Sequence, residues 1–427
     1  MHIELADNYR HTAEGRVGAE LISACVHCGF CLETCPTYLD RRDERDSPRG
    51  RIYLIRQLLE TGEANSNTRR HLDRCLTCRS CETTCPSGME YGRLLDLGRE
   101  LVEAQVPRSL SQRSFRWLLR HTVSRPQLFG VLLRIGQMLR PLLPVSLKRQ
   151  VPERQQRRPV LQTPGHTRRM LLLEGCVQAA ATPTTNDAAR RLLNRLGITL
   201  HSAQQAGCCG AVHYHLAARD DGRDNMRRNI DAWWPAIADG AEAIVSTASG
   251  CGALIAEYGA LLADDPAYAA KAQHVSDLHR DMVQVLEAED LSALPPATGI
   301  GKVAVHVPCS LQHALQLPTQ LPDLLRRLGF DVVPGRDGHL CCGSAGTYSI
   351  LEPAASQRLR ERKLHSLTGS SPAVIVTANI GCQLQLGGTE TPVMHWLELL
   401  DTCTAFPKAS TELQAAGHPE ATGSQAS

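Results

Sequence analysis

The sequence predicts a mixed α+β and α/β chain, in which a helical N-terminal domain precedes two repeated α/β halves with mostly parallel sheets. Two cysteine runs of identical spacing, CVHCGFCLETCP and CLTCRSCETTCP, lie fifty residues apart within residues 1–105. Between residues 166 and 403, short β-branched runs alternate with helical patterns, which is typical of a parallel sheet covered on both faces. Four cysteines of this region recur at a nearly constant interval, which indicates an internal repeat.

Length and composition narrow the possible functions. The 427 residues suffice for two or three domains. A net charge of +2 and an aromatic content of 4% argue against nucleic acid as a partner. The polar N-terminus does not resemble a secretion signal, and no apolar run is long enough for a transmembrane helix. We therefore expect a cytoplasmic protein, in which seventeen cysteines indicate metal or redox chemistry rather than disulfides.

The chain divides into five expected regions. The ferredoxin-type domain at 1–105 is followed by a basic amphipathic linker at 106–165, by the repeats at 166–295 and 296–403, and by a disordered tail at 404–427. Four segments in the repeats have the composition of buried strands, and each ends at a cysteine: RMLLLEGC, AEAIVSTASGC, KVAVHVPC and AVIVTANIGC.

The N-terminal cysteine runs predict two [4Fe–4S] clusters. In ferredoxins with two clusters, the three cysteines of C-x2-C-x2-C ligate one cluster and the cysteine before proline ligates the other. This rule assigns Cys25, Cys28, Cys31 and Cys85 to the first cluster, and Cys75, Cys78, Cys81 and Cys35 to the second. A zinc site is the alternative, but it leaves the third cysteine and the Cys-Pro of each run without a role.

The segment between the cysteine runs predicts a helix. Ser47 and Pro48 are typical of a helix start, and the apolar residues that follow share one face. Its three arginines, Arg49, Arg51 and Arg56, either lie near the clusters, where positive charge favours the reduced state, or form a solvated face. The sequence leaves both interpretations open.

Each repeat reads strand–Cys, then Cys-Cys-Gly, then strand–Cys. Carboxyl ends of parallel strands meet at one edge of a sheet, so each half should gather four thiols there. The candidate metal ligands are Cys176, Cys208, Cys209 and Cys251 in the first half, and Cys309, Cys341, Cys342 and Cys382 in the second. An iron–sulfur cluster, zinc, redox-active thiols and simple buried cysteines remain alternatives. His306 is a candidate fifth ligand in the second half, although a structural role is the commoner one for such a histidine.

At this point the sequence resembles a known family. The stretches CVHCGFCLETCPTYLD, DSPRGRIYLI and HLDRCLTCRSCETTCPSGMEYGRLLDLGR are similar to those of the iron–sulfur subunit of bacterial glycolate oxidase (glycolate dehydrogenase), in which two CCG domains also follow. The resemblance extends from about residue 5 to 403. It implies a complex in which partner flavin-domain subunits hold FAD and oxidise glycolate to glyoxylate, and in which clusters pass electrons to the quinone pool at the inner membrane. A related D-lactate or glycerol-3-phosphate dehydrogenase is the alternative.

The same CCG halves resemble those of heterodisulfide reductases, with one departure. Those enzymes use a fifth cysteine, whose position is taken here by Ala248 and Asn379. A thiol/disulfide reductase is therefore the weaker hypothesis. No G-x-G-x-x-G follows a strand and no P-loop is present, so we assign no catalytic residue, flavin site or nicotinamide site to this chain.

The linker carries the signature of a membrane-surface segment. Residues 104–152 contain nine Arg and Lys residues and no acidic residue, interleaved with large apolar side chains. Such a segment can lie on an anionic membrane, and we expect the contact over 106–150. The alternative is a pair of helices packed between domains with arginines outward. The remaining conspicuous residues are assigned to core, loop or surface positions: Cys403, Trp233, Trp234, Trp396, His213 and His215.

Overall fold

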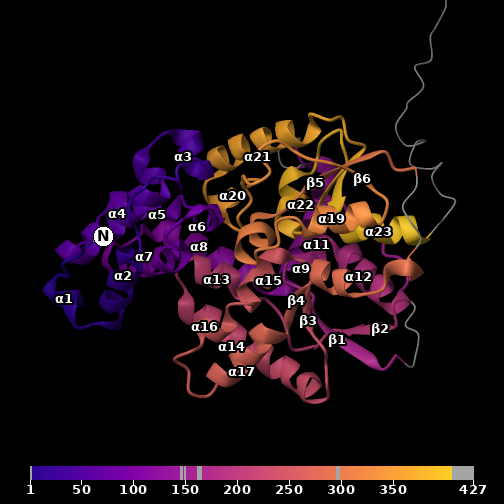
Figure 1. Cartoon of the computed structure of the whole chain (residues 1–427), viewed down its shortest axis with the longest axis horizontal. Helices are drawn as coiled ribbons and strands as arrows, with labels where there is room; N and C mark the ends of the chain where they lie inside the picture. Colours follow the sequence, from indigo (N-terminus) through magenta and orange to yellow (C-terminus); the bar gives the residue numbers. More distant parts are fainter. Residues whose placement is uncertain (1, 145–147, 149–150, 161–165, 295–298, 406–427) are drawn as a thin grey trace, which may run out of the picture.

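The computed structural model describes residues 2–144, 148, 151–160, 166–294 and 299–405. The expected tail lies outside the described residues from 406 onward, as do parts of the linker and of the junction between the repeats. Figure 1 shows the N-terminal domain at one end of the molecule and the two α/β halves side by side next to it. Among the described residues, no helix combines the length and apolar character needed to cross a membrane.

The N-terminal domain is helical because its apolar residues recur at helical spacing around one core. The helix α4 (Pro48–Thr61) begins as the sequence predicts: the Ser47 hydroxyl accepts from the Gly50 N–H at 2.9 Å, and Pro48 occupies the first turn. It ends at Gly62, which has a φ of +78°. The other helices of this domain are α1 (Asp7–Arg10), α2 (Ala13–Ser23), α3 (Pro36–Arg41), α5 (Ser66–Asp73), α6 (Ser80–Thr84) and α7 (Tyr91–Gln105), with a 3₁₀ turn at Glu44–Asp46.

The first half contains a four-stranded parallel sheet in the order β2-β1-β3-β4. The central strands β1 (Arg168–Leu173) and β3 (Ile244–Ser246) are those that the sequence predicts, whereas the edge strands β2 (Ile198–His201) and β4 (His279–Asp281) are short and were not predicted. The helices of this half are α11 (Gln178–Ala181), α12 (Pro183–Arg195), α13 (Ala211–His215), α14 (Arg219–Ala238), α15 (Ser249–Ile255), α16 (Tyr258–Leu261), α17 (Ala269–Leu278) and α18 (Met282–Ala288).

The second half repeats this topology in the order β6-β5-β7-β8, again all parallel. Its central strands are β5 (Lys302–His306) and β7 (Val374–Thr377), and its edge strands are β6 (Asp331–Val333) and β8 (Val393–His395). The helices are α19 (Gln320–Arg327), α20 (Tyr348–Leu351), α21 (Pro353–Thr368), α22 (Ile380–Leu386) and α23 (Trp396–Ala405), with 3₁₀ and π turns at Leu291–Ala293 and Ser310–Ala314. The predicted fold class, with its internal repeat, is therefore confirmed.

The two halves share one hydrophobic core. Buried side chains of both sheets, such as Leu172 and Val305, belong to the same cluster. The C-terminal helix α23 packs against α12 of the first half, where Arg191 forms an ion pair with Asp401 at 2.7 Å. Trp233 and Trp396 are fully buried, as the core assignment predicts. Because the apolar faces cover each other, the halves form one structural unit.

The linker forms two helices, α8 (Leu110–Val123) and α9 (Pro126–Leu139), followed by a 3₁₀ turn at Arg140–Leu142. The alternative with arginines outward is wrong for Arg108 and Arg116, which both pair with Asp73 in the interior. Instead, large apolar side chains face outward: Leu110, Phe115, Trp117, Leu118, Leu128, Val131, Leu132, Ile135, Met138, Leu139 and Leu142 are exposed. The linker therefore presents an apolar surface that the rest of the described chain leaves uncovered.

Candidate metal centres

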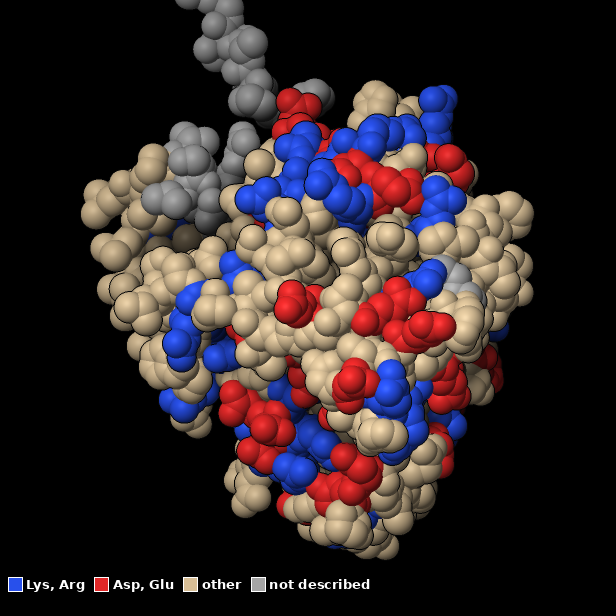
Figure 2. All heavy atoms as spheres, turned by 90° about the vertical axis from the view of Figure 1, so that its left-hand side faces the viewer, with Lys and Arg blue, Asp and Glu red and all other residues tan. Residues whose placement is uncertain are grey.

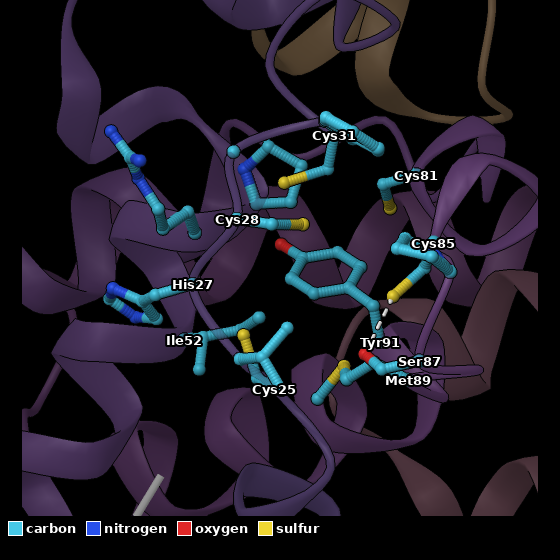
Figure 3. A pocket seen from close by; sticks show the side chains of 16 residues that line it. Cys25, His27, Cys28, Cys31, Ile52, Cys81, Cys85, Ser87, Met89 and Tyr91 are labelled. Carbon is cyan, nitrogen blue, oxygen red and sulfur yellow. Dashed lines mark hydrogen bonds between the residues drawn. The ribbon is translucent and has the colours of Figure 1, made fainter.

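The first cysteine cavity lies in the N-terminal domain and holds the ligand set expected for the first cluster. Cys25, Cys28, Cys31 and Cys85 all line a space of about 410 Å³. Figure 3 shows their sulfur atoms turned toward this common space, with the ring of Tyr91 between them. Cys85 comes from the second cysteine run, so the fold brings the two runs together in the crossed manner that the sequence predicts.

The second cysteine cavity adjoins the first. Its lining includes Cys35, Cys75, Cys78 and Cys81 around a space of about 290 Å³. This is the complementary crossed set, with Cys35 contributed by the first run. Pro48, Cys81 and Tyr91 line both cavities, so one thin wall separates them.

The backbone of the two cysteine runs has the same unusual shape. His27 and Thr77 occupy equivalent positions and have φ values of +57° and +51°, and Gly29 and Arg79 follow at +85° and +59°. Non-glycine residues seldom adopt this left-handed region, and a β-branched threonine does so least. Such alternation turns successive backbone N–H groups toward one side, which suits an anionic group. The loops therefore have the conformation of a binding loop rather than of an ordinary turn.

The thiols of the second cavity are buried deeply enough to resist ionisation on their own. Burial, together with the neighbouring thiols, raises the pKa of Cys78 and Cys81 well above the usual value. In the first cavity burial raises the pKa of Cys31 to about 11. A metal that replaces the thiol protons removes this cost, so the thiol sets fit a metal or cluster better than they fit the free chain.

The arginines of α4 divide between the two interpretations that the sequence left open. Arg51 is fully buried in the wall of the second cavity, where Nε donates to the carbonyl of His71 at 2.7 Å. Its Nη2 makes no hydrogen bond to any described residue. Arg49 lines the first cavity, whereas Arg56 pairs with Glu60 on the outer side of the helix. Two of the three therefore place positive charge beside sites where a thiolate-bound cluster would carry negative charge.

The four cysteines of the first CCG half meet at the carboxyl edge of its sheet. Cys176 follows β1, the pair Cys208 and Cys209 follows β2, and Cys251 lies at the start of α15 behind β3. Their thiols interact in the order 176–208–209–251. Hydrogen bonds from the thiols of Cys176 and Cys209, with the nearby His213, lower the pKa of Cys208 well below the usual value for a thiol. Cys208 is thus the thiol of this half that ionises most readily.

The second half gathers its thiols in the same way, with a histidine added. The sulfur atoms of Cys309 and Cys341 are 3.9 Å apart, and those of Cys342 and Cys382 are 3.4 Å apart. A ring nitrogen of His306 and the sulfurs of Cys342 and Cys382 all lie within 4.8 Å of one another. His306 is 1% exposed, and burial with the charge of Lys363 lowers its pKa well below the usual value. The neutral ring is able to act as a ligand.

The second half, rather than the first, places its thiols against the second cysteine cavity. Cys78 of that cavity and Cys309 pack against one apolar cluster that contains Leu76 and Cys341. Nearby, the hydroxyl of Thr83 bonds Nδ1 of His313 at 2.9 Å. Neither the hydroxyl nor His313 stands out in the sequence, because the contact joins residues 230 positions apart. The second cavity thus lies between the N-terminal domain and the second half.

Family comparisons agree with this architecture. A 4Fe-4S dicluster domain matches residues 21–89, and a cysteine-rich domain matches residues 170–256 and 303–387. The glycolate oxidase iron-sulfur subunit of Escherichia coli is 49% identical over 94% of this chain and 98% of its own length. This chain belongs to the glycolate oxidase iron–sulfur subunit family.

Other relatives are more distant. The probable glycolate oxidase iron-sulfur subunit of Bacillus subtilis is 30% identical over 85% of this chain and 87% of its own length. Lactate utilization protein A of Bacillus velezensis is 30% identical over 50% of this chain and 91% of its own length. A crystal structure of a hypothetical protein from Helicobacter pylori shares the fold with a TM-score of 0.55 at 10% identity, over 96% of this chain and 76% of that one.

Proposed function

We propose that this chain is the electron-transfer subunit of a glycolate-oxidising complex, in which a flavin-containing partner oxidises glycolate to glyoxylate. The observation that carries the proposal is the pair of adjoining four-cysteine cavities with a shared wall. A [4Fe–4S] cluster accepts and donates one electron at a time. The chain's residues hold two such groups next to each other: Cys25, Cys28, Cys31 and Cys85 around the first, and Cys75, Cys78, Cys81 and Cys35 around the second.

The surroundings of the cavities suggest a direction for transfer. Cys28 is exposed, and Val26 and Phe30 beside it are 64% and 61% exposed. The first cavity thus opens at the surface under an apolar rim, where a partner can dock and exclude water. The second cavity is enclosed by the N-terminal domain and the second CCG half. We place the flavin partner at the exposed rim. The CCG thiol sets are held as additional metal ligands.

Iron and sulfide analysis tests the first part of this proposal. The anaerobically purified chain should contain about eight iron and eight sulfide, since each cluster contributes four of both. Cys28→Ser should abolish glycolate-dependent dye reduction by the complex while the partner flavin is still reduced by glycolate. Cys403→Ser is the matched control because Cys403 packs at the edge of the shared core, away from both cavities. A preparation with zinc and without sulfide would contradict the proposal.

The apolar surface of α8 and α9 supports attachment to the inner membrane, where electrons would enter the quinone pool. Arg113, Arg125 and Arg134 are exposed among the apolar side chains, which suits anionic lipid headgroups. By contrast, the face at the N-terminal end of the molecule has interspersed positive and negative charges (Figure 2). No acidic residue occurs in residues 104–152 to oppose this contact.

Vesicle flotation tests this attachment. The double variant Val131→Glu, Ile135→Glu should bind anionic vesicles at least several-fold more weakly than the unaltered chain, because both side chains belong to the exposed face of α9. Ile350→Glu serves as control, since Ile350 is also exposed but lies on α20 of the second half. Equal flotation of all three proteins would contradict the proposal, as would binding that neutral vesicles match.

A further inference from the structure

The second CCG half contains a buried imidazole that the electron-transfer role leaves unexplained. Both ring nitrogens of His306 lack a hydrogen-bond partner among the described residues, although the side chain is only 1% exposed. Burying a polar ring with neither nitrogen paired costs free energy, and proteins usually avoid it. The ring lies beside the thiols of Cys342 and Cys382. A metal ion would satisfy the imidazole and the thiols together.

We propose that the second half binds a single zinc ion through His306, Cys342, Cys382 and one further thiol of the same cluster. The site is distinct from the two cysteine cavities of the N-terminal domain. It adds an imidazole to the cysteine set that the motif alone predicts, and it specifies a mononuclear ion. Cys341 is the nearest candidate for the fourth ligand, because its thiol interacts with those of both Cys309 and Cys342.

The spacing of the donor atoms favours one ion over a cubane cluster. Two sulfur ligands about 2.3 Å from one tetrahedral zinc lie about 3.8 Å apart. The sulfurs of Cys342 and Cys382 are 3.4 Å apart, and those of Cys309 and Cys341 are 3.9 Å apart. In a [4Fe–4S] cluster each thiolate binds a different iron, so the ligand sulfurs must stand much farther from one another. A mixed imidazole and thiolate set is also a common ligand set of structural zinc.

The local charge suits three thiolates on a divalent ion. Such a site with one neutral imidazole has a net charge of −1. The ammonium group of Lys363 is 3% exposed and interacts electrostatically with Cys341, Cys342 and Cys382. Its Nζ is fixed by the carbonyls of Asp337 and Gly338 at 3.1 and 3.2 Å. A buried lysine beside the cluster therefore compensates the charge that metal binding leaves.

The internal repeat provides a natural comparison. His306 and Lys363 each lie 133 residues after an apolar residue of the first half, Leu173 and Ile230, as Cys309 lies 133 residues after Cys176. Leu173 and Ile230 pack with Cys209 in an apolar cluster. The first half therefore has the thiols without the imidazole and without the lysine. The proposed site is specific to the second half.

Elemental analysis of the full chain, purified without oxygen from zinc- and iron-replete cells, tests the site. His306→Leu, which copies the first half, should lose about one zinc per chain relative to the unaltered protein. His306→Cys should retain it, because a thiolate can replace the imidazole. At the zinc absorption edge, the unaltered protein should show a nitrogen ligand that the cysteine variant lacks. His279→Leu is the control, since His279 is a buried histidine of the first half that faces Ser246.

Three results would overturn the proposal. The first is a chain without zinc, and the second is equal zinc in His306→Leu and the unaltered protein. The third is iron and sulfide in excess of the eight of each that two cubane clusters contain, because this would indicate a cluster in the second half. The EPR signals of the N-terminal clusters report separately on the electron-transfer proposal. They should be unchanged in His306→Leu.

Discussion

The two CCG halves have the same sheet order and the same four thiols, yet the residues around those thiols differ. Where the first half has Leu173 and Ile230, the second has His306 and Lys363. The edge strands differ as well: Asp281 pairs with Ser246 in the first half, and His395 pairs with Thr377 at the matching position of the second. The strand ends thus determine where the thiols meet, whereas the neighbouring buried residues determine the charge and ligands at the site.

The largest expected difference concerns pH. Burial raises the pKa of Asp281 to about 7, above its value of about 4 in the unfolded chain. The folded state therefore binds more protons between these values, and its stability falls as the pH rises from 4 through 7, by about 4 kcal/mol in total. Asp281→Asn removes this loss and still caps α18. Urea midpoints at pH 5 and pH 8 should differ less in the variant than in the unaltered protein.

The matched residue of the second half should act in the opposite direction. Burial lowers the pKa of His395 to about 4, below its unfolded value of about 6.5. Its contribution to stability is present above pH 6.5 and is lost as the pH falls toward 4. Identical pH profiles for Asp281→Asn and the unaltered chain would contradict this contrast between the halves.

The next effect compares Lys363 with Ile230. Lys363→Met leaves the carbonyls of Asp337 and Gly338 unpaired and removes a buried cation beside three thiols, so we expect a loss of about 3 kcal/mol in unfolding free energy. Ile230→Met exchanges similar volumes in an apolar cluster and should cost less than about 1.5 kcal/mol. Chemical denaturation of both variants measures the difference. Equal losses would mean that the lysine does not compensate charge.

The smallest effects concern how each half attaches to the N-terminal domain. The first half uses an ion pair between Arg79 and Glu257, and the second uses one between Arg358 and Asp40 at 2.6 Å. Arg79 is the less exposed arginine, so Glu257→Gln should cost about 1 kcal/mol and Arg358→Gln less than that. The loss for Arg358→Gln should also shrink as salt is added, which denaturation at two ionic strengths would show.

The sequence predicts the parts of this structure that depend on local patterns. The central strands end at cysteines and are continuous apolar runs, so they are recognisable, whereas edge strands such as His279–Asp281 are only three residues long and are formed by pairing with a neighbour. The crossed cysteine sets follow from spacing. The contact between Thr83 and His313 could not be predicted, because it depends on how distant domains pack.

His306 lies between these extremes. Its distance from Cys309 marks it as a possible ligand, but the sequence alone favoured a structural role because it does not reveal whether the ring nitrogens find partners. Alignment of the two repeats gives a further signal: a histidine replaces Leu173 at a strand position where the first half requires an apolar residue. The outward apolar face of the linker was likewise open until packing showed which side of α8 holds Arg108 and Arg116.

The left-handed backbone at His27 and Thr77 has a consequence for how this protein is made. A threonine gains nothing from that conformation by itself, so the newly synthesised loop has little reason to adopt it before its inorganic guest arrives. Delivery of iron and sulfide would then complete the polypeptide's shape as well as its chemistry. Cells short of either element would accumulate chains whose amino-terminal third is unfinished and open to proteases.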